Sequence, residues 1–389
     1  MNRDLLLMMI SLLAWGVGDG MFYHFQPLYL ARLGASPEAI GRVLGVAGAL
    51  MTVVHLPVGR LVDRWGPHRL LVAGWMVGTI GGVFMAVARR LSVFVVGLWF
   101  YHLSLFVMVP LQAYLSLVRG RFSLARVLTL TSGAFNLGMV VGPWLGGRIA
   151  AHWGLPRVYA VAAGLFVLST VLVSRTRPHV WHESSPSQPA VASSWRQALR
   201  ELPWGVWAFV AWLGVMLLLV TVPQPLLPNF LNEKRGVPLP VIGELGTWYA
   251  LGATAANFTL GALTARWGLT LALAGQALAA GLIWHGASLG AYRSAYFLFG
   301  GMRAARPLAH AQIQELTTPQ QRGLTYGLVE TVAGLALTIA SLLAGWLYTR
   351  APFVLFAAPA VALGGLPLGW WLARPRPSSG PRRERVSRS

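Results

Sequence analysis

The chain has 389 residues, of which 56% are hydrophobic and 11% are charged. An average soluble domain carries about 25% charged residues, so this composition excludes a soluble enzyme, a disordered protein and a collagen-like fibre. The formal net charge is +20. The basic residues occupy short gaps between apolar stretches, which indicates membrane topology and argues against nucleic-acid binding.

Twelve stretches are long and apolar enough to cross a bilayer, which takes about 20 residues each. They cover residues 5–30, 38–58, 70–89, 91–117, 127–150 and 155–174, and then 204–230, 240–262, 269–289, 294–316, 324–347 and 352–372. The sequence therefore predicts an all-α membrane protein with twelve transmembrane helices in two pseudo-symmetric six-helix bundles. The bundles are residues 1–174 and 204–373, with a cytoplasmic linker at 175–203 and a basic tail at 374–389.

Most of the 31 basic residues fall on one side if the N-terminus is cytoplasmic. By the positive-inside rule, we expect both termini in the cytoplasm of a plasma or inner membrane. The chain lacks cysteine, and it has no phosphate-binding loop, serine-hydrolase motif or zinc-protease motif. We therefore expect no enzyme activity, no metal and no cofactor.

The two halves repeat each other weakly. GRLVDRWG at 59–66 follows the second predicted helix, and GALTARWG at 261–268 follows the eighth. Internal repeats of this kind are typical of secondary transporters. The first copy and the residues after it resemble the loop 2–3 signature of the major facilitator superfamily. Its matching residues are Gly59, Asp63, Arg64, Gly66 and Arg69.

This resemblance implies alternating access around a central cavity lined by helices 1, 4, 7 and 10. It also implies that Asp63 gates the cytoplasmic side by binding the N-terminus of helix 11, where a carboxylate gains from free N–H groups. The second copy has Ala265 at the matching position, so we assign the gate to the first half. We further expect a monomer that binds a small molecule and works in a lipid bilayer.

Helix 5 resembles the exporter and antiporter branches of the same family. The motif comprises Gly138, Gly142, Pro143, Gly146 and Gly147. Small residues at this spacing also allow close helix packing, so packing alone is an equal interpretation. The basic residue of many drug–proton antiporters is missing from helix 4, where His102 is the titratable side chain.

Ionisable side chains at mid-membrane depth are costly and therefore indicate function. Helix 10 carries Arg303, Arg306 and His310 on one face, since they are three and four residues apart. Asp19 lies midway along helix 1 and is their natural partner. Two arginines and one aspartate leave a net positive charge, which favours an anionic or zwitterionic organic solute.

Other residues are weaker candidates for contact with the solute or for carrying a proton. Tyr23 and Gln26 share a helix face with Asp19, whereas Trp99 and Trp212 either contact solute or only pack. Because no ATP site exists, we expect an ion gradient to drive transport, with protons as the first choice. The candidate proton carriers are Asp19, His102, His310 and Glu330.

Helix 7 ends in a stretch with three prolines, at 223, 225 and 228, which predicts a break and an outer hinge. Two other functions stay open at this stage. The first is efflux of lipophilic drugs by an antiporter. The second, of another class, is a membrane sensor or receptor that does not transport.

Overall fold

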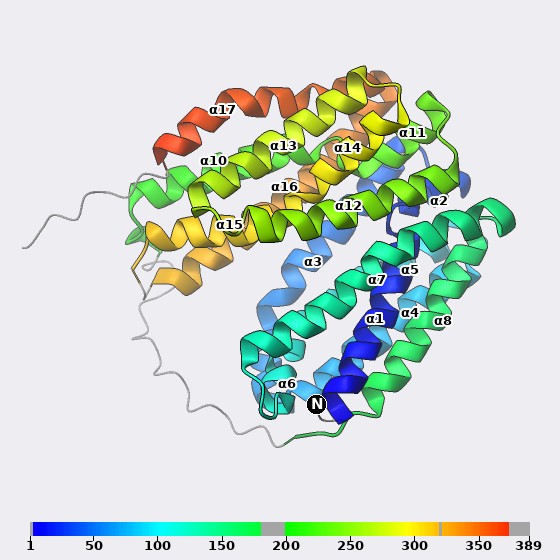
Figure 1. Ribbon diagram of the computed structural model, residues 1–389, viewed down its shortest axis with the longest axis vertical. Coiled ribbons are helices and arrows are strands. Elements are labelled where there is room, and N and C mark those ends of the chain that lie inside the picture. The colour runs from blue at the N-terminus through cyan, green and yellow to red at the C-terminus, as the bar shows by residue number, and fades with distance from the viewer. Residues whose placement is uncertain (1–2, 180–198, 319–320, 373–389) are drawn as a thin grey trace, which may run out of the picture.

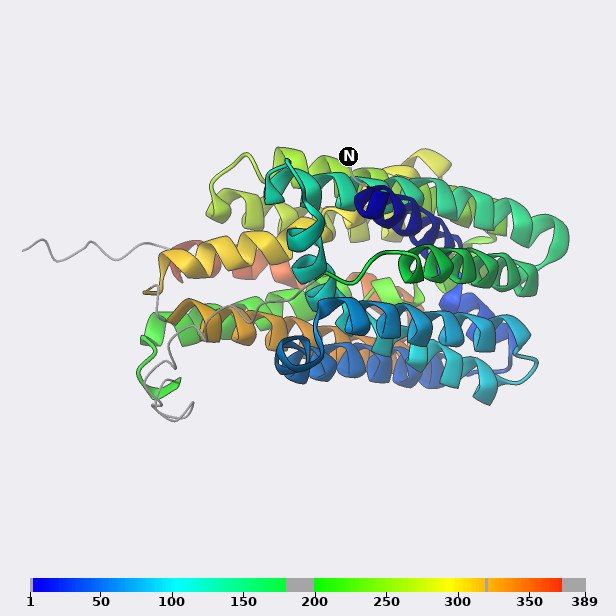
Figure 2. The same ribbon diagram turned by 90° about the horizontal axis from the view of Figure 1, so that it is seen from below.

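The computed structural model describes residues 3–179, 199–318 and 321–372. Over these ranges the chain is helical apart from short turns, and it contains no strand. The helices form two groups, one before and one after the linker (Figure 1). Figure 2, at right angles, shows most helices of both groups running roughly along a common direction.

The first group holds the helices up to residue 174. They are α1 (Arg3–Tyr23), α2 (Gln26–Arg32), α3 (Pro37–Trp65), α4 (Pro67–Val87), α5 (Leu91–Leu103), the 3₁₀ turn η1 (Ser104–Val107), α6 (Met108–Val118), α7 (Leu124–Trp153) and α8 (Leu155–Ser174).

The second group starts after the linker. Its members are α10 (Trp204–Thr221), η2 (Gln224–Leu226), α11 (Leu227–Arg235), α12 (Leu239–Thr259), α13 (Ala265–His285), α14 (Leu289–Gly300), α15 (Met302–Glu315), α16 (Arg322–Arg350), η4 (Pro352–Phe356) and α17 (Ala358–Leu372).

Serine caps fix the starts of three helices. The hydroxyl groups of Ser36, Ser123 and Ser288 accept hydrogen bonds from the backbone N–H three residues on, at 3.2, 3.3 and 3.2 Å. Each cap satisfies one of the N–H groups that a helix start leaves without a partner. The first turn of α3, α4, α8 and α12 also contains proline, which needs no such partner there.

The predicted fold class is confirmed, because helical segments in the described residues coincide with all twelve predicted stretches. Eight segments are long and apolar enough to cross a membrane on their own composition. The other four, in α3, α7, α12 and α14–α15, fall short of that measure but pack within the same two groups.

Five predicted helices are broken: in the twelfth the 3₁₀ turn η4 precedes α17, and the other four are the first, fourth, seventh and tenth. The breaks lie after Tyr23, at 104–107, at 222–226 and at Gly301. The break at 222–226 was predicted, since Pro223 and Pro225 remove helical hydrogen bonds. Each of these four helices opens a run of three, so the chain has a fourfold internal pattern.

Contacts between the two groups gather at the end of the molecule where α2 and α11 lie, opposite the N-terminus (Figure 1). Between this end and the middle of the helices, the Thr247 hydroxyl donates to the carbonyl of Val140 at 2.9 Å. At the end itself Arg350 lies 3.4 Å from the Glu38 carboxylate. We call this the closed end, and the two groups diverge from it toward the N-terminal end (Figure 1).

Glycines make the closed end tight. A Cβ on Gly41 of α3 would collide with the backbone of Ser341 and Gly345 on α16. A Cβ on Gly243 of α12 would collide with α7 at Gly147. Small residues thus let the backbones of the two groups touch, as in other close helix contacts within membranes.

Candidate functional site

A polar cluster lies midway along the helices, between the two groups. Asp19 comes from α1 and accepts a hydrogen bond from Tyr101 of α5. Arg303 comes from the start of α15, hydrogen-bonds Tyr249 of α12 and stands 5.8 Å from the centre of that ring. Arg303 also interacts electrostatically with Asp19 and Tyr23. The structure thus brings Asp19 and Arg303 into one electrostatic cluster, and a direct contact between them stays a prediction.

These side chains are reachable by solvent although they lie at mid-depth. Tyr23 keeps 39% of its surface exposed, Asp19 is half-buried and Arg303 is exposed. An arginine at this depth is tolerated where it faces water or a partner charge. Because the two groups touch at the closed end, the cluster communicates with solvent from the N-terminal end.

Aromatic rings separate the cluster from the closed end. His24 is buried, and its ring lies 5.4 Å from Tyr249, 5.9 Å from Tyr296 and 5.1 Å from Tyr23. A Cβ on Gly246 of α12 would collide with the His24 ring. His24 lies in the break between α1 and α2. Its imidazole therefore reaches from the first group to Tyr249, Tyr296 and Gly246 of the second group.

A second charged group lies one turn further along α15. The Glu330 carboxylate of α16 is 3.4 Å from Arg306 and 3.1 Å from Nε2 of His310. The His310 ring also stacks on Tyr326, with 4.9 Å between centres. All three charged side chains are partly exposed.

This second group corrects one expectation. The net positive charge expected at mid-depth is wrong, because Glu330 adds a second carboxylate beside Arg306. Two arginines and two carboxylates sum to zero when His310 is neutral. The structure thus separates Arg303, which faces Asp19, from Arg306, which faces Glu330.

The remaining predicted solute residues lie elsewhere. The Trp99 indole donates to the Val43 carbonyl of α3 at 3.2 Å, and the Trp212 indole donates to the Gly365 carbonyl of α17 at 2.8 Å. Both tryptophans therefore fix helix packing, and the structure does not bring them to the cluster.

Two further candidates have polar atoms that lack partners among the described residues. Both ring nitrogens of His102 are buried without a hydrogen bond, and the ring meets Tyr101 edge-on at 5.9 Å. Gln26 begins α2 and is buried, and its Nε2 is likewise unpartnered there. The side chains that interact with Arg303 are Tyr249, Tyr23 and Asp19, and neither His102 nor Gln26 is among them.

The helix 5 motif lies at the closest approach of α7 to two other helices. Gly138, Gly142 and Gly146 face the backbone of α1, and Gly147 faces that of α12. Pro143 lies inside α7 and contacts Gly20 of α1. Any larger side chain at the glycines would push α7 off α1, so packing accounts for the small residues.

The loop 2–3 motif is described in part. Gly66 separates α3 from α4 with φ of +77°, a backbone conformation that glycine adopts without strain. Arg64 and Arg69 are exposed. The surroundings of Gly59 and the side chain of Asp63 lie outside what the structure describes, and so does the tail from 374 onward.

Sequence reasoning missed the tyrosines of the cluster. Tyr101, Tyr249 and Tyr296 are the aromatic partners of Asp19, Arg303 and His24. Aromatic residues make up 11% of the chain, so nothing in the sequence distinguishes these three. Their positions on the inward faces of α5, α12 and α14 become apparent only once the packing of these helices against α1 and α15 is known.

Comparison with known proteins agrees with this architecture. The sequence profile of the Major Facilitator Superfamily matches residues 5–224 and 206–388. An uncharacterized MFS-type transporter of Methanocaldococcus jannaschii is 23% identical over 173 residues, which are 44% of this chain and 45% of the relative. Multidrug resistance protein 1 of Bacillus subtilis is 22% identical over 179 residues, or 46% of each chain. The chain spans about half the length of the curated relatives it matches.

A solved structure covers more of the chain. A variant of the nucleoside transporter NupG superposes with a TM-score of 0.80, over 96% of this chain and 99% of that one. The two sequences are 11% identical. At this identity the likeness shows a shared fold, and it leaves the solute to be argued from the residues.

Proposed function

This chain belongs to the Major Facilitator Superfamily and is a multi-pass membrane protein, and we propose that it is a secondary active transporter for a small organic zwitterion or anion. One observation carries the proposal. Asp19 and Arg303 come from opposite halves and interact electrostatically at mid-depth, where Asp19 is half-buried and Arg303 is exposed. Alternating access requires a site of this kind, which both halves share.

The chemistry of the pair favours particular solutes. A guanidinium fork binds a carboxylate or phosphate through two parallel hydrogen bonds. Asp19 offers a carboxylate to an ammonium group, so a zwitterion satisfies both side chains at once. An anion satisfies only Arg303, and a proton on Asp19 then balances the charge. We therefore propose that anions enter together with a proton.

Protons are also the proposed driving ion, because the sequence has no ATP-binding loop. Besides Asp19, the Glu330–His310 pair offers two titratable groups 3.1 Å apart. The two groups lie within ion-pair distance, although Nε2 of His310 makes no hydrogen bond among the described residues. We propose these groups for proton coupling in preference to His102, because both His102 ring nitrogens are buried without a hydrogen bond among the described residues.

The proposed location is the plasma or inner membrane, with both termini in the cytoplasm. The loop arginines support this orientation, and the chain would act as a monomer. In that orientation the closed end faces outward, and the Asp19–Arg303 pair is open to the cytoplasm. Reporter fusions after residue 372 give the side of the C-terminus directly.

A second function is favoured by one observation. Aromatic rings surround the charged pair, with Trp15 stacked on Tyr101 at 6.1 Å and Tyr249 against Arg303. Such walls also suit lipophilic compounds, and a Bacillus subtilis relative is a multidrug resistance protein. Drug efflux is therefore the alternative, although an exposed arginine disfavours cationic drugs.

The test is a thermal-shift screen of the purified protein with zwitterionic, anionic, neutral and cationic solutes, at two pH values. A solute at a hundredfold excess over its Kd adds about 2.7 kcal/mol of stability. Hits among zwitterions or anions, followed by pH-driven uptake into sealed vesicles, support the proposal. Hits confined to lipophilic cations move drug efflux to first place, and binding without flux indicates a sensor.

A further inference from the structure

A groove on the outside of the first group lies apart from the Asp19–Arg303 cluster. It lies between the start of α4 and the end of α8 and has a volume of about 350 Å³. Its lining residues are His68, Arg69, Val72, Ala73, Met76 and Ser174. We propose that this groove binds an anionic phospholipid, with the headgroup phosphate at Arg69 and an acyl chain along α4.

The two levels of the groove match the two parts of a phospholipid. Arg69 is exposed where the apolar run of α4 begins, and Arg175 is exposed directly after Ser174. Below them, Met76 exposes 51% of its surface. The same outer face of α4 continues with further exposed apolar side chains, at Ile80, Val83 and Val87. A phosphate beside the arginines thus leaves the acyl chain on an apolar helix face.

The walls of the groove are fixed to each other. Trp75 of α4 donates its indole N–H to the Ser169 hydroxyl of α8 at 2.8 Å. The Thr79 hydroxyl donates to the carbonyl of Phe166 at 3.1 Å. It also lies 2.7 Å from the Thr170 hydroxyl. These bonds hold the groove open before a lipid arrives, so binding costs little ordering of the protein.

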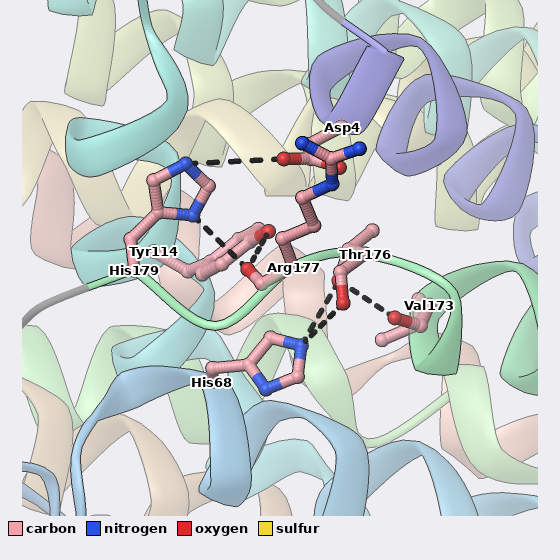
Figure 3. Close-up of polar contacts among 7 residues, drawn as sticks. All are labelled: Asp4, His68, Tyr114, Val173, Thr176, Arg177 and His179. Carbon is pink, nitrogen blue, oxygen red and sulfur yellow. Dashed lines mark hydrogen bonds and ion pairs between the residues drawn. The ribbon is translucent and has the colours of Figure 1, made fainter.

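The upper rim is fixed as well. Nε2 of His68 lies 3.0 Å from the carbonyl oxygen and 3.2 Å from the hydroxyl of Thr176, and the Tyr114 hydroxyl donates to the Arg177 carbonyl at 2.9 Å (Figure 3). The segment after α8 is therefore tied to α4 and α6, which sets where Arg175 lies.

Charge at this rim favours an anion. Arg64, Arg69, Arg175 and Arg177 are all exposed. The acidic Asp4 is buried 3.8 Å from His179, and the Arg177 side chain points toward it (Figure 3), so Arg64, Arg69 and Arg175 carry the positive charge of the rim. Basic pockets between transmembrane helices at a membrane surface bind anionic headgroups, and each arginine near the surface adds about fivefold in affinity.

The experiment is native mass spectrometry of the full chain in neutral detergent, titrated with phosphatidylglycerol or with phosphatidylcholine of the same acyl chains. We expect preferential retention of phosphatidylglycerol. Arg69→Gln should weaken it about fivefold, and Arg175→Gln in the same chain should weaken it by a similar factor again. Met76→Gln should weaken both lipids, because the acyl chain loses its wall.

The matched control is Arg157→Gln, an exposed arginine in the first turn of the same helix α8, at its other end. It should leave retention unchanged, and melting curves without lipid show that each variant is folded. Equal retention of the two lipids, or no effect of Arg69→Gln, overturns the proposal. Displacement by glycerol phosphate as effective as by whole lipid also overturns it, since that result indicates a free phosphate site. None of these outcomes depends on transport.

Discussion

The carboxylate of Glu330 on α16 lies 3.1 Å from Nε2 of His310 on α15, and the same carboxylate reaches Arg306 at 3.4 Å. One acidic group therefore serves a permanent cation and a titratable one. If His310 takes up a proton, the charge of this group changes without any change at Arg303. Under the proposed function, solute and proton would bind at neighbouring but separate positions on α15.

Replacing Glu330 tests that separation. Glu330→Gln leaves Arg306 and His310 without a carboxylate, so proton-driven accumulation in vesicles should fall at least tenfold while solute binding persists. The control is Glu244→Gln, which removes a carboxylate that pairs with Arg293 at 2.7 Å away from this group. If Glu330→Gln accumulates solute normally, the proton is carried by Asp19.

Arg303 and Arg306 should behave differently when neutralised. Arg303→Gln should weaken binding of carboxylate solutes about 10- to 100-fold, because a charge-assisted hydrogen bond contributes about 1.5–3 kcal/mol. Arg306→Gln should leave the Kd within about threefold, since Arg306 faces Glu330. Calorimetric titration measures both. Equal losses in the two variants would show that the arginines act together.

Gly41 should control closure of the end where the two groups meet. Gly41→Leu places a side chain against the backbone of Ser341, so the closed end should open. Spin labels at Arg42→Cys and Thr349→Cys report the separation, and the chain has no cysteine of its own. Gly281→Leu is the matched control, because a Cβ there has open space. An unchanged distance in Gly41→Leu argues against the glycine contact as the closure.

The ion pair of Glu38 and Arg350 should matter little. The two side chains are 39% and 52% exposed, and exposed pairs contribute about 0–1 kcal/mol. Arg350→Glu should open the closed end slightly at low salt and not at high salt. Exchanging the two residues should restore the wild-type label distance. A large effect that persists at high salt would contradict this interpretation.

Much of the fold could be predicted because a helix that crosses a lipid bilayer must be long and apolar. Runs of about 20 apolar residues identify helices, and the prolines at 223 and 225 marked one break. The breaks at 104–107 and after Tyr23 were not predicted, although Pro27 and Pro110 mark them, since each lacks the N–H that would bond to the carbonyl four residues earlier. They depend on how α1 and α5 pack against their neighbours.

The candidate site could be predicted only in part. Asp19 and Arg303 stood out because buried charges are rare in membranes. Arg306 was placed beside them because helical spacing shows which side chains share a face. Spacing does not show which neighbouring helix meets that face, and here α16 presents Glu330 to Arg306. The tyrosines were hidden among many aromatic residues for the same reason.

The glycine contacts at the closed end have a consequence for the speed of the transport cycle. Bare backbone surfaces meet there, with no long side chains interleaved between α3 and α16 at Gly41 and Gly345. Parting such surfaces requires neither rotamer changes nor the disruption of a large polar network. The free-energy barrier to opening the closed end should therefore be low. The transport rate should then depend more on whether solute occupies the Asp19–Arg303 pair than on the contacts at the closed end.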